Sequence, residues 1–322
     1  MARQIKYDRS AEDVGNLFSL EHVNLQVDGL ERALVFYVEA LGLTRDPYMM
    51  TGGRIGWINA GRNQFHLIQG KPQVVAGHIG LVMPGRRDLL ARLDAAKPHL
   101  AGTEFSYEEM DDCVIAVCPW GNRFRIHEPA AGFGRMTLGM PYVEVDVRPG
   151  TVEGIVAFYR DIVHAPGRVT EERGAPAARI SVGREQAIVF RETEGVIRPF
   201  DGHHIQVYLS DFSGPHGRLS ERDLITEESN EHQYRFEVIT DPTTGAELSR
   251  IEHEVRSIGH PLFNRALINR NPSQTNVNYA AGLDAYVPPN TARETDDPRL
   301  RDLLKGFNEQ LANPGNGPEG VA

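Results

Sequence analysis

Apolar and polar residues alternate along short segments of this chain, and a strand-then-helix pattern recurs. The segment "LEHVNLQV" (residues 20–27) alternates with a period of two, which predicts a half-buried strand. The following "ERALVFYVEALGL" has apolar residues three and four apart, which predicts a helix. The same order returns in "MPYVEVDV" and "VEGIVAFYRDIV", and both helices carry a Phe-Tyr pair, Phe36-Tyr37 and Phe158-Tyr159. The repeat indicates a duplicated strand-helix unit.

Turn signals between the apolar segments extend each copy to a βαβββ unit. In the first unit we expect strands at 20–27, 44–50, 54–60 and 63–69 and a helix at 30–42. In the second we expect strands at 77–83, 104–109, 112–118 and 123–128 and a helix at 86–98. After the connector "PAAGFGRMTLGMP", two further units occupy about 140–192 and 203–257. The pattern predicts an α+β fold with two domains, each a pair of units, at 1–136 and 137–287, followed by a mobile tail at 288–322.

The composition is ordinary for a globular protein. The chain has 322 residues, with 34 Lys and Arg against 44 Asp and Glu. This acidic balance disfavours nucleic acid and anionic membrane surfaces as partners, since phosphate binding needs clustered cations. No apolar run approaches the roughly 20 residues of a membrane span. The two cysteines, Cys113 and Cys118, are too few for a disulfide framework and fit buried thiols in a reducing cytoplasm.

The four units, the "HVNLQV" opening followed by Phe-Tyr and Leu-Gly, and the "GHIGLV" that restarts the unit resemble the vicinal oxygen chelate superfamily. That superfamily includes glyoxalase I, extradiol dioxygenases and bleomycin-resistance proteins. The resemblance covers residues 20–257. It implies that each pair of units forms a cupped mixed sheet around a divalent metal, with ligands on the first and last strand of each unit. It also implies that cup edges pair between subunits, so a homodimer or a higher homo-oligomer is expected.

Carried over residue by residue, the resemblance places His22, His66 and His78 as metal ligands in the first cup. Arg125 stands in the fourth place, where the family usually has a carboxylate. Its planar guanidinium suits a substrate carboxylate or enolate, so it is a substrate-binding candidate. His127 has the same strand parity and is a candidate general acid or base. Each histidine taken alone also fits a hydrogen-bonded core residue.

In the second cup, the resemblance gives Tyr142, Ile188, His204 and Glu252 at the same four places. His204 and Glu252 are the less favoured metal ligands, with Tyr142 or Glu144 as a third. Tyr142 is also a catalytic candidate. Alternatively, His204 and Glu252 form a hydrogen-bonded pair that braces a closed cup. The segment "NRALINRNP" (264–272) is a possible lid with Arg265 or Arg270 reaching inward.

Three neutral imidazoles suit a borderline divalent ion, with Fe(II) favoured and Zn, Mn, Co or Ni as alternatives. Such an ion polarises a carbonyl, lowers the pKa of bound water or binds O₂ beside a bidentate substrate. Because four units in one chain resemble the extradiol enzymes, the resemblance implies as the leading hypothesis a ring-cleaving-type dioxygenase that acts on a small, oxygen-rich, aromatic substrate. A glyoxalase-type isomerase or lyase is the second hypothesis. The third is a non-catalytic protein that sequesters a ligand without a metal.

Overall fold

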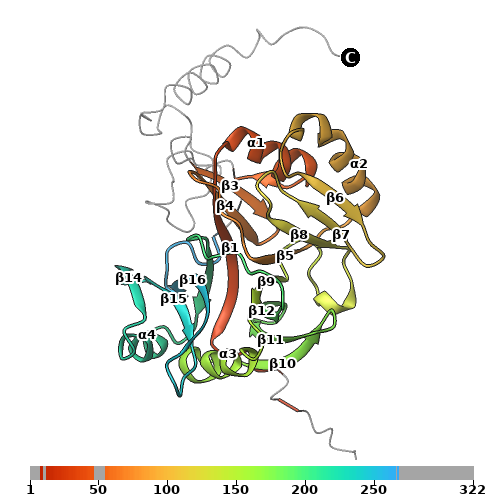
Figure 1. The fold of residues 1–322 in the computed structure, drawn as a ribbon. Helices are drawn as coiled ribbons and strands as arrows, with labels where there is room; N and C mark the ends of the chain where they lie inside the picture. The colour runs from red at the N-terminus through yellow and green to blue at the C-terminus, as the bar shows by residue number, and fades with distance from the viewer. Residues whose placement is uncertain (1–7, 10–11, 47–54, 266, 268–322) are drawn as a thin grey trace, which may run out of the picture.

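In the computed structural model, the residues that the structure describes form two eight-stranded sheets (Figure 1). The structure describes residues 8–9, 12–46, 55–265 and 267. The predicted tail at 288–322 and part of the strand expected at 44–50 lie outside the described residues. Among the described residues, every helix is too short or too polar to cross a lipid bilayer.

All four βαβββ units that the sequence predicts are present. The first comprises β1 (Leu17–Val27), α1 (Leu30–Leu34), η2 (Val35–Ala40), β2 (Thr44–Arg45), β3 (Ile55–Ala60) and β4 (Asn63–Gln69). The second comprises β5 (Gly77–Val82), α2 (Arg86–Ala96), η3 (Lys97–Leu100), β6 (Ser106–Glu109), β7 (Val114–Val117) and β8 (Arg123–His127).

The short η4 (Ala131–Phe133) lies in the connector between the second and third units. The third unit comprises β9 (Tyr142–Val147), α3 (Val152–Phe158), η5 (Tyr159–Val163), β10 (Gly167–Glu172), β11 (Ala175–Val182) and β12 (Gln186–Glu192). The fourth comprises β13 (His204–Leu209), α4 (Ser213–Ser220), β14 (Ile225–Asn230), β15 (Gln233–Thr240) and β16 (Glu247–Ser257).

The units pair in an order that the sequence analysis did not expect. Sheet A runs β14-β15-β16-β13-β1-β4-β3-β2 and joins the first unit to the fourth. Sheet B runs β10-β11-β12-β9-β5-β8-β7-β6 and joins the second unit to the third. Two antiparallel contacts, β1 with β13 and β5 with β9, make these junctions. The first strand of every unit has a similar pattern, so the sequence alone does not reveal which first strands meet. The domain limits at 136 and 287 stay a prediction.

One continuous hydrophobic core connects both sheets and their helices. Phe36 and Tyr37 of η2, and their counterparts Phe158 of α3 and Tyr159 of η5, are fully buried in it, which explains why the helices carry this pair. α1 and α2 lie at one end of the molecule and α3 and α4 at the other (Figure 1). Cys113 and Cys118 are free buried thiols, as expected.

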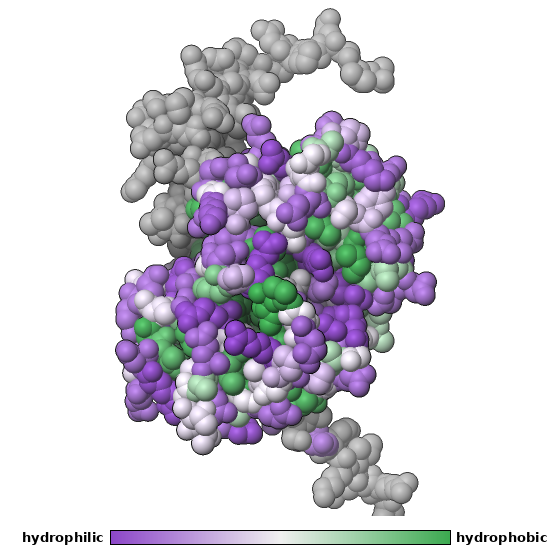
Figure 2. Space-filling model, in the orientation of Figure 1, coloured by the Kyte–Doolittle hydropathy of each residue, from purple (hydrophilic) through white to green (hydrophobic). Residues whose placement is uncertain are grey.

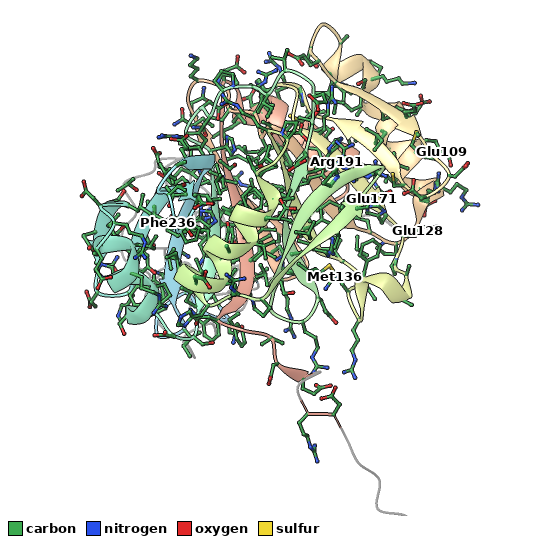
Figure 3. The ribbon with its side chains drawn as sticks, turned by 60° about the horizontal axis from the view of Figure 1, so that its bottom comes forward. Glu109, Glu128, Met136, Glu171, Arg191 and Phe236 are labelled. Atoms are coloured by element: carbon green, nitrogen blue, oxygen red, sulfur yellow. The ribbon has the colours of Figure 1, made fainter. Side chains whose placement is uncertain are left out.

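Figure 2 shows one face of the molecular surface, and Figure 3 shows side chains on the two sheets. The face shown in Figure 2 is mostly hydrophilic, with apolar residues near its middle. Figure 3 separates Phe236, on β15 of sheet A, from Glu128 and Glu171, which lie beside or on strands of sheet B.

Candidate metal centre

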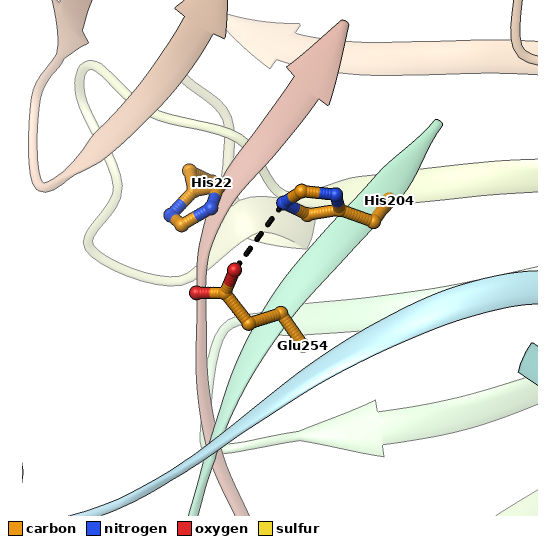
Figure 4. A group of neighbouring side chains, drawn as sticks. All are labelled: His22, His204 and Glu254. Atoms are coloured by element: carbon orange, nitrogen blue, oxygen red, sulfur yellow. Dashed lines mark ion pairs between the residues drawn. The ribbon is translucent and has the colours of Figure 1, made fainter. Parts of the chain in front are cut away.

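Three buried side chains from three strands of sheet A converge on one point (Figure 4). They are His22 of β1, His204 of β13 and Glu254 of β16. One donor atom from each residue lies within 4.8 Å of the others. Two imidazole nitrogens and one carboxylate oxygen thus face a common position.

Strand register explains why these residues meet. β1 runs antiparallel to β13, which places His22 opposite Gln206 and Asn24 opposite His204. β13 runs parallel to β16, which places Gln206 beside Glu254. Side chains alternate between the two faces of a strand, so His204 and Gln206 share one face. The intervening Ile205 and Val207 point into the hydrophobic core. The register therefore brings His204 and Glu254, about 180 and 230 positions later in the chain, next to His22.

A carboxylate holds one nitrogen of each imidazole ring, and the other nitrogen faces the cluster. His22 Nδ1 lies 3.3 Å from Glu21 Oε2, whereas His22 Nε2 is buried without a hydrogen-bond partner. His204 Nδ1 lies 3.2 Å from Glu252 Oε1, and its Nε2 lies 3.4 Å from Glu254 Oε2. A carboxylate that fixes the orientation and tautomer of an imidazole is the usual outer partner of a metal-binding histidine.

The protonation states fit a cation. Burial is the largest cause that holds the pKa of His22 well below its usual value, so this ring is neutral at pH 7 and its lone pair is available. Burial raises the pKa of Glu254, but the positive charge of Arg256, with that of Arg235, outweighs burial and the net pKa is lowered. Glu254 is therefore ionised.

Two arginines neutralise the Glu254 carboxylate. Arg235 Nη2 lies 2.6 Å from Oε2, and Arg256 Nη2 lies 2.6 Å from Oε1. The Arg256 contact is an ion pair without hydrogen-bond geometry, because Oε1 has no hydrogen-bond partner among the described residues. Arg256 also reaches Glu21 at 3.3 Å, so the charges around the cluster form one network.

The types of donor atom in this cluster suit a divalent metal. Two imidazoles and one carboxylate form the ligand set of non-haem Fe(II) oxygenases, in which three facial ligands leave coordination positions open. The buried, unpartnered His22 Nε2 needs a partner, and a metal ion supplies one. The residues present therefore fit a divalent metal.

His66 of β4 lies beside this cluster but not in it. Its ring stacks on His22 with centroids 3.7 Å apart and an interplanar angle of 26°. Trp57 stacks on the other face, at 3.9 Å and 14°. Imidazole lone pairs lie in the ring plane, so two nearly parallel rings do not aim at one ion. In this conformation His66 braces His22, whereas the sequence analysis expected it to be a ligand.

The structure separates His78 from the two histidines with which it was expected to share a cup. His78 is on β5 of sheet B, where its Nδ1 lies 3.2 Å from Glu144 Oε1. Glu252, the other predicted ligand, holds His204 Nδ1 from outside and also pairs with Arg235 at 2.6 Å. Ile188 lies in the hydrophobic core. The cause is the pairing order of the units, which joins β1 to β13 instead of to a strand of the second unit.

The remaining predicted site residues all lie in sheet B. Tyr142 is 8% exposed and makes a 2.9 Å hydrogen bond with His127 Nε2. Burial is the largest cause that lowers the pKa of His127 and raises that of Tyr142. Arg125 pairs with Asp112 at 3.1 Å. The catalytic roles of His127 and Tyr142 and the substrate-binding role of Arg125 stay predictions.

The segment after β16 reaches the first unit and covers the side of the cluster. Arg265 Nη2 lies 2.7 Å from Asp46 Oδ2, and both side chains are almost completely buried. Gln64 Nε2 donates to the same oxygen at 3.1 Å, and Leu262 packs on Trp57. Arg265 thus reaches inward, as expected for the predicted lid, but toward sheet A. Arg270 lies outside the described residues.

The sequence analysis missed two residues as site residues, Glu254 of this cluster and Gln206 beside it. Glu252 and Glu254 share strand parity, so only the register with β13 shows which one is beside Gln206. A signal for Gln206 was present, namely a polar residue in the otherwise apolar run "HIQVYL". The parity that it shares with His204 places it on the same face.

Comparisons with known proteins support this architecture. No protein-family model matches the chain, and no curated protein matches its sequence. A candidate dioxygenase from Bacillus subtilis subsp. subtilis str. 168 is similar in structure, with a TM-score of 0.54 and 15% identity over 95% of this chain and 99% of that chain. Glyoxalase I from Zea mays is similar with a TM-score of 0.52 and 13% identity over 74% of this chain and 92% of that chain. Similarity at this level is a similarity of fold. The chain therefore has the fold of the vicinal oxygen chelate proteins, as its sequence predicts.

Proposed function

We propose that this protein is a metal-dependent dioxygenase of ring-cleaving type that acts on a small aromatic molecule with two adjacent hydroxyl groups. The convergence of His22, His204 and Glu254 carries the proposal. This donor set is the one that non-haem Fe(II) oxygenases use. The structural similarity to a candidate dioxygenase is consistent with it.

Fe(II) is the favoured metal because two imidazoles and one carboxylate leave three positions open. If it were bound by His22, His204 and Glu254, Fe(II) would supply a site for the diol and redox chemistry with O₂, and the diol itself would provide the electrons. Zn, Mn, Co and Ni remain alternatives for the same ligands.

The chain's own residues prepare this centre. Glu21 holds His22 Nδ1 and Glu252 holds His204 Nδ1, so that Nε2 of each ring is directed at the metal position. Arg235 and Arg256 keep Glu254 ionised. Trp57, stacked on His66, and the segment that carries Arg265 shield the centre from water, which strengthens the electrostatic interactions inside it.

Oxygen uptake tests the proposal. Protein reconstituted with Fe(II) without oxygen is mixed with catechol and substituted catechols, and O₂ consumption is followed together with ring-cleavage absorbance. We expect uptake in the wild type and none in His204→Ala. A fully Fe(II)-loaded wild type that consumes no O₂ with any catechol contradicts the proposal.

A glyoxalase-type isomerase or lyase is the second candidate, and the position of His66 favours it. His66 of β4 lies beside Asn24 of β1. Glu254 of β16 lies in the same way beside Gln206 of β13, so His66 and Glu254 occupy equivalent places in their units. If His66 rotated away from His22, four residues of the chain could hold a metal, which would supply Lewis acidity for an isomerisation. Isomerisation of a hemithioacetal by the metal-loaded protein, without O₂ uptake and lost in His66→Ala, would select this candidate. The absence of any bound metal would instead favour a non-catalytic binding protein.

The location and assembly expected from the sequence stay proposals. A cytoplasmic protein that forms a homodimer or a higher homo-oligomer is consistent with this function.

A further inference from the structure

Gln206 is a buried amide without partners. It lies on β13 with 0% of its surface exposed. Neither its Nε2 nor its Oε1 has a hydrogen-bond partner among the residues that the structure describes. A buried amide that gives up water without replacing its hydrogen bonds is costly, so nearly all such groups are paired in folded proteins. Gln206 therefore needs an explanation.

Its position in sheet A points to one. Gln206 is directly opposite His22 on one side and directly beside Glu254 on the other. It also shares a strand face with His204, two residues earlier. The amide is thus flanked by all three residues of the candidate metal centre, and His22 Nε2 next to it is likewise without a partner.

The chemistry of an amide narrows the class of partner. A metal ion can bind Oε1 but not the Nε2 amino group, which only donates. The missing partner must therefore accept a hydrogen bond as well as donate one. An aromatic diol that has lost one proton offers both, because its deprotonated oxygen accepts and its remaining hydroxyl group donates.

We infer that Gln206 is a specificity-determining residue that contacts the two oxygen atoms of an aromatic vicinal diol held at the metal centre. The amino group donates to the deprotonated oxygen, and the amide oxygen accepts from the hydroxyl group. This inference rests on the proposed function and deepens it.

Sheet B shows that an unpaired side chain at this place is not a consequence of the fold. Glu144 of β9 occupies the equivalent place, opposite His78. Its carboxylate contacts both His78 and Arg173 through Oε1, so it has charged partners within the protein. The unpaired state of Gln206 is therefore particular to the cup with the metal ligands.

Binding of 4-nitrocatechol, whose absorbance shifts when it loses protons, tests the inference without turnover. The full chain is loaded with redox-inactive Zn, its metal content is measured, and the chromophore is titrated into wild type and Gln206→Leu. Leucine fills a similar volume without hydrogen bonds. Gln26→Leu is the matched control, because it changes the same residue type on the same face of β1, about 13 Å from His22 along the strand.

We expect Gln206→Leu to keep the wild-type metal content and to bind 4-nitrocatechol on the order of tenfold more weakly, with Gln26→Leu unchanged. Unchanged affinity in Gln206→Leu overturns the inference alone. A loss of metal in Gln206→Leu also overturns it, because Gln206 would then serve the metal. If metal-loaded wild type binds no 4-nitrocatechol, the proposed function fails together with the inference.

Discussion

The two sheets repeat one architecture but differ in the groups that they present at equivalent places. In sheet A these places on β1, β4, β13 and β16 hold His22, His66, His204 and Glu254. In sheet B the corresponding places on β5, β8, β9 and β12 hold His78, Arg125, Tyr142 and Val189. Sheet B thus keeps a single metal-type donor of the four. The comparison shows that both sheets keep the fold, whereas only sheet A has histidine or carboxylate side chains at all four of these places.

The polar groups of sheet B are already paired with one another. Glu144 contacts His78 and Arg173, and Tyr142 makes a hydrogen bond with His127. The Tyr142 ring also packs against Gly80, where an added Cβ would lie 2.6 Å from the ring. Sheet A instead leaves His22 Nε2 and the Gln206 amide without partners. Polar side chains that are hydrogen-bonded to one another, as in sheet B, stabilise the fold. Buried polar atoms that lack partners, as in sheet A, are available to bind a ligand.

Replacing the equivalent histidines should separate the two cups most strongly. We expect His204→Ala to lose nearly all bound metal and His78→Ala to retain it, because His204 belongs to the converging set and His78 does not. The loss in His204→Ala should exceed the 10- to 100-fold that removal of an outer partner typically costs in affinity. Metal content after dialysis, measured by mass spectrometry, checks both variants.

The unfolding temperature of each metal-free variant is the control, since it shows whether a loss of metal reflects a loss of fold. Equal metal loss in both variants, or loss in His78→Ala alone, would show that sheet A is not the metal cup.

The paired carboxylate of sheet B should give the protein a measurable acid sensitivity. Burial raises the pKa of Glu144, but the hydrogen bonds from His78 and Arg173 outweigh it and bring the pKa to about 2, from an ordinary value of 4.5. A carboxyl group with a lowered pKa stabilises the folded state above pH 4.5, and this stability is lost as the pH falls toward 2. At 1.36 kcal/mol per pH unit, the contribution is about 3 kcal/mol.

Urea unfolding at pH 7 and at steps below pH 4.5 measures this contribution. Glu144→Gln should be less stable than wild type at pH 7 and should lose less stability on acidification. Glu171→Gln, an exposed change in the same sheet, should follow wild type. An acid dependence in Glu144→Gln equal to that of wild type would show that the Glu144 network is not the brace of sheet B.

The sequence predicts the units well because periodicity is a local property. The helix expected at 86–98 is α2 at Arg86–Ala96, and the strand expected at 63–69 is β4 with the same limits. Pairing between units is not local. Each unit offers a similar first strand with one open edge, so the contact of β1 with β13 depends on packing across the whole chain.

The candidate site was predictable to the same extent. His22 and His204 follow from the repeated opening of the units. Glu252 and Glu254 have equal parity, and the choice between them needs the register of β16 against β13. The sequence analysis placed His78 in one cup with His22 because it paired the first unit with the second. In the structure the first unit pairs with the fourth, so the two histidines are in different sheets.

The smallest expected effect concerns Glu252 and shows whether this residue binds the metal directly or only holds His204. Because Glu252 holds His204 Nδ1 at 3.2 Å, we expect Glu252→Leu to weaken metal binding about 10- to 100-fold, the usual cost of losing an outer partner. Glu252→Gln should restore most of the affinity, since its amide oxygen still accepts from Nδ1–H. Competition with a chromophoric chelator measures both variants. A direct ligand would behave differently: both variants would then lose metal as completely as His204→Ala, and the three-residue set in sheet A would have to include Glu252 in place of Glu254.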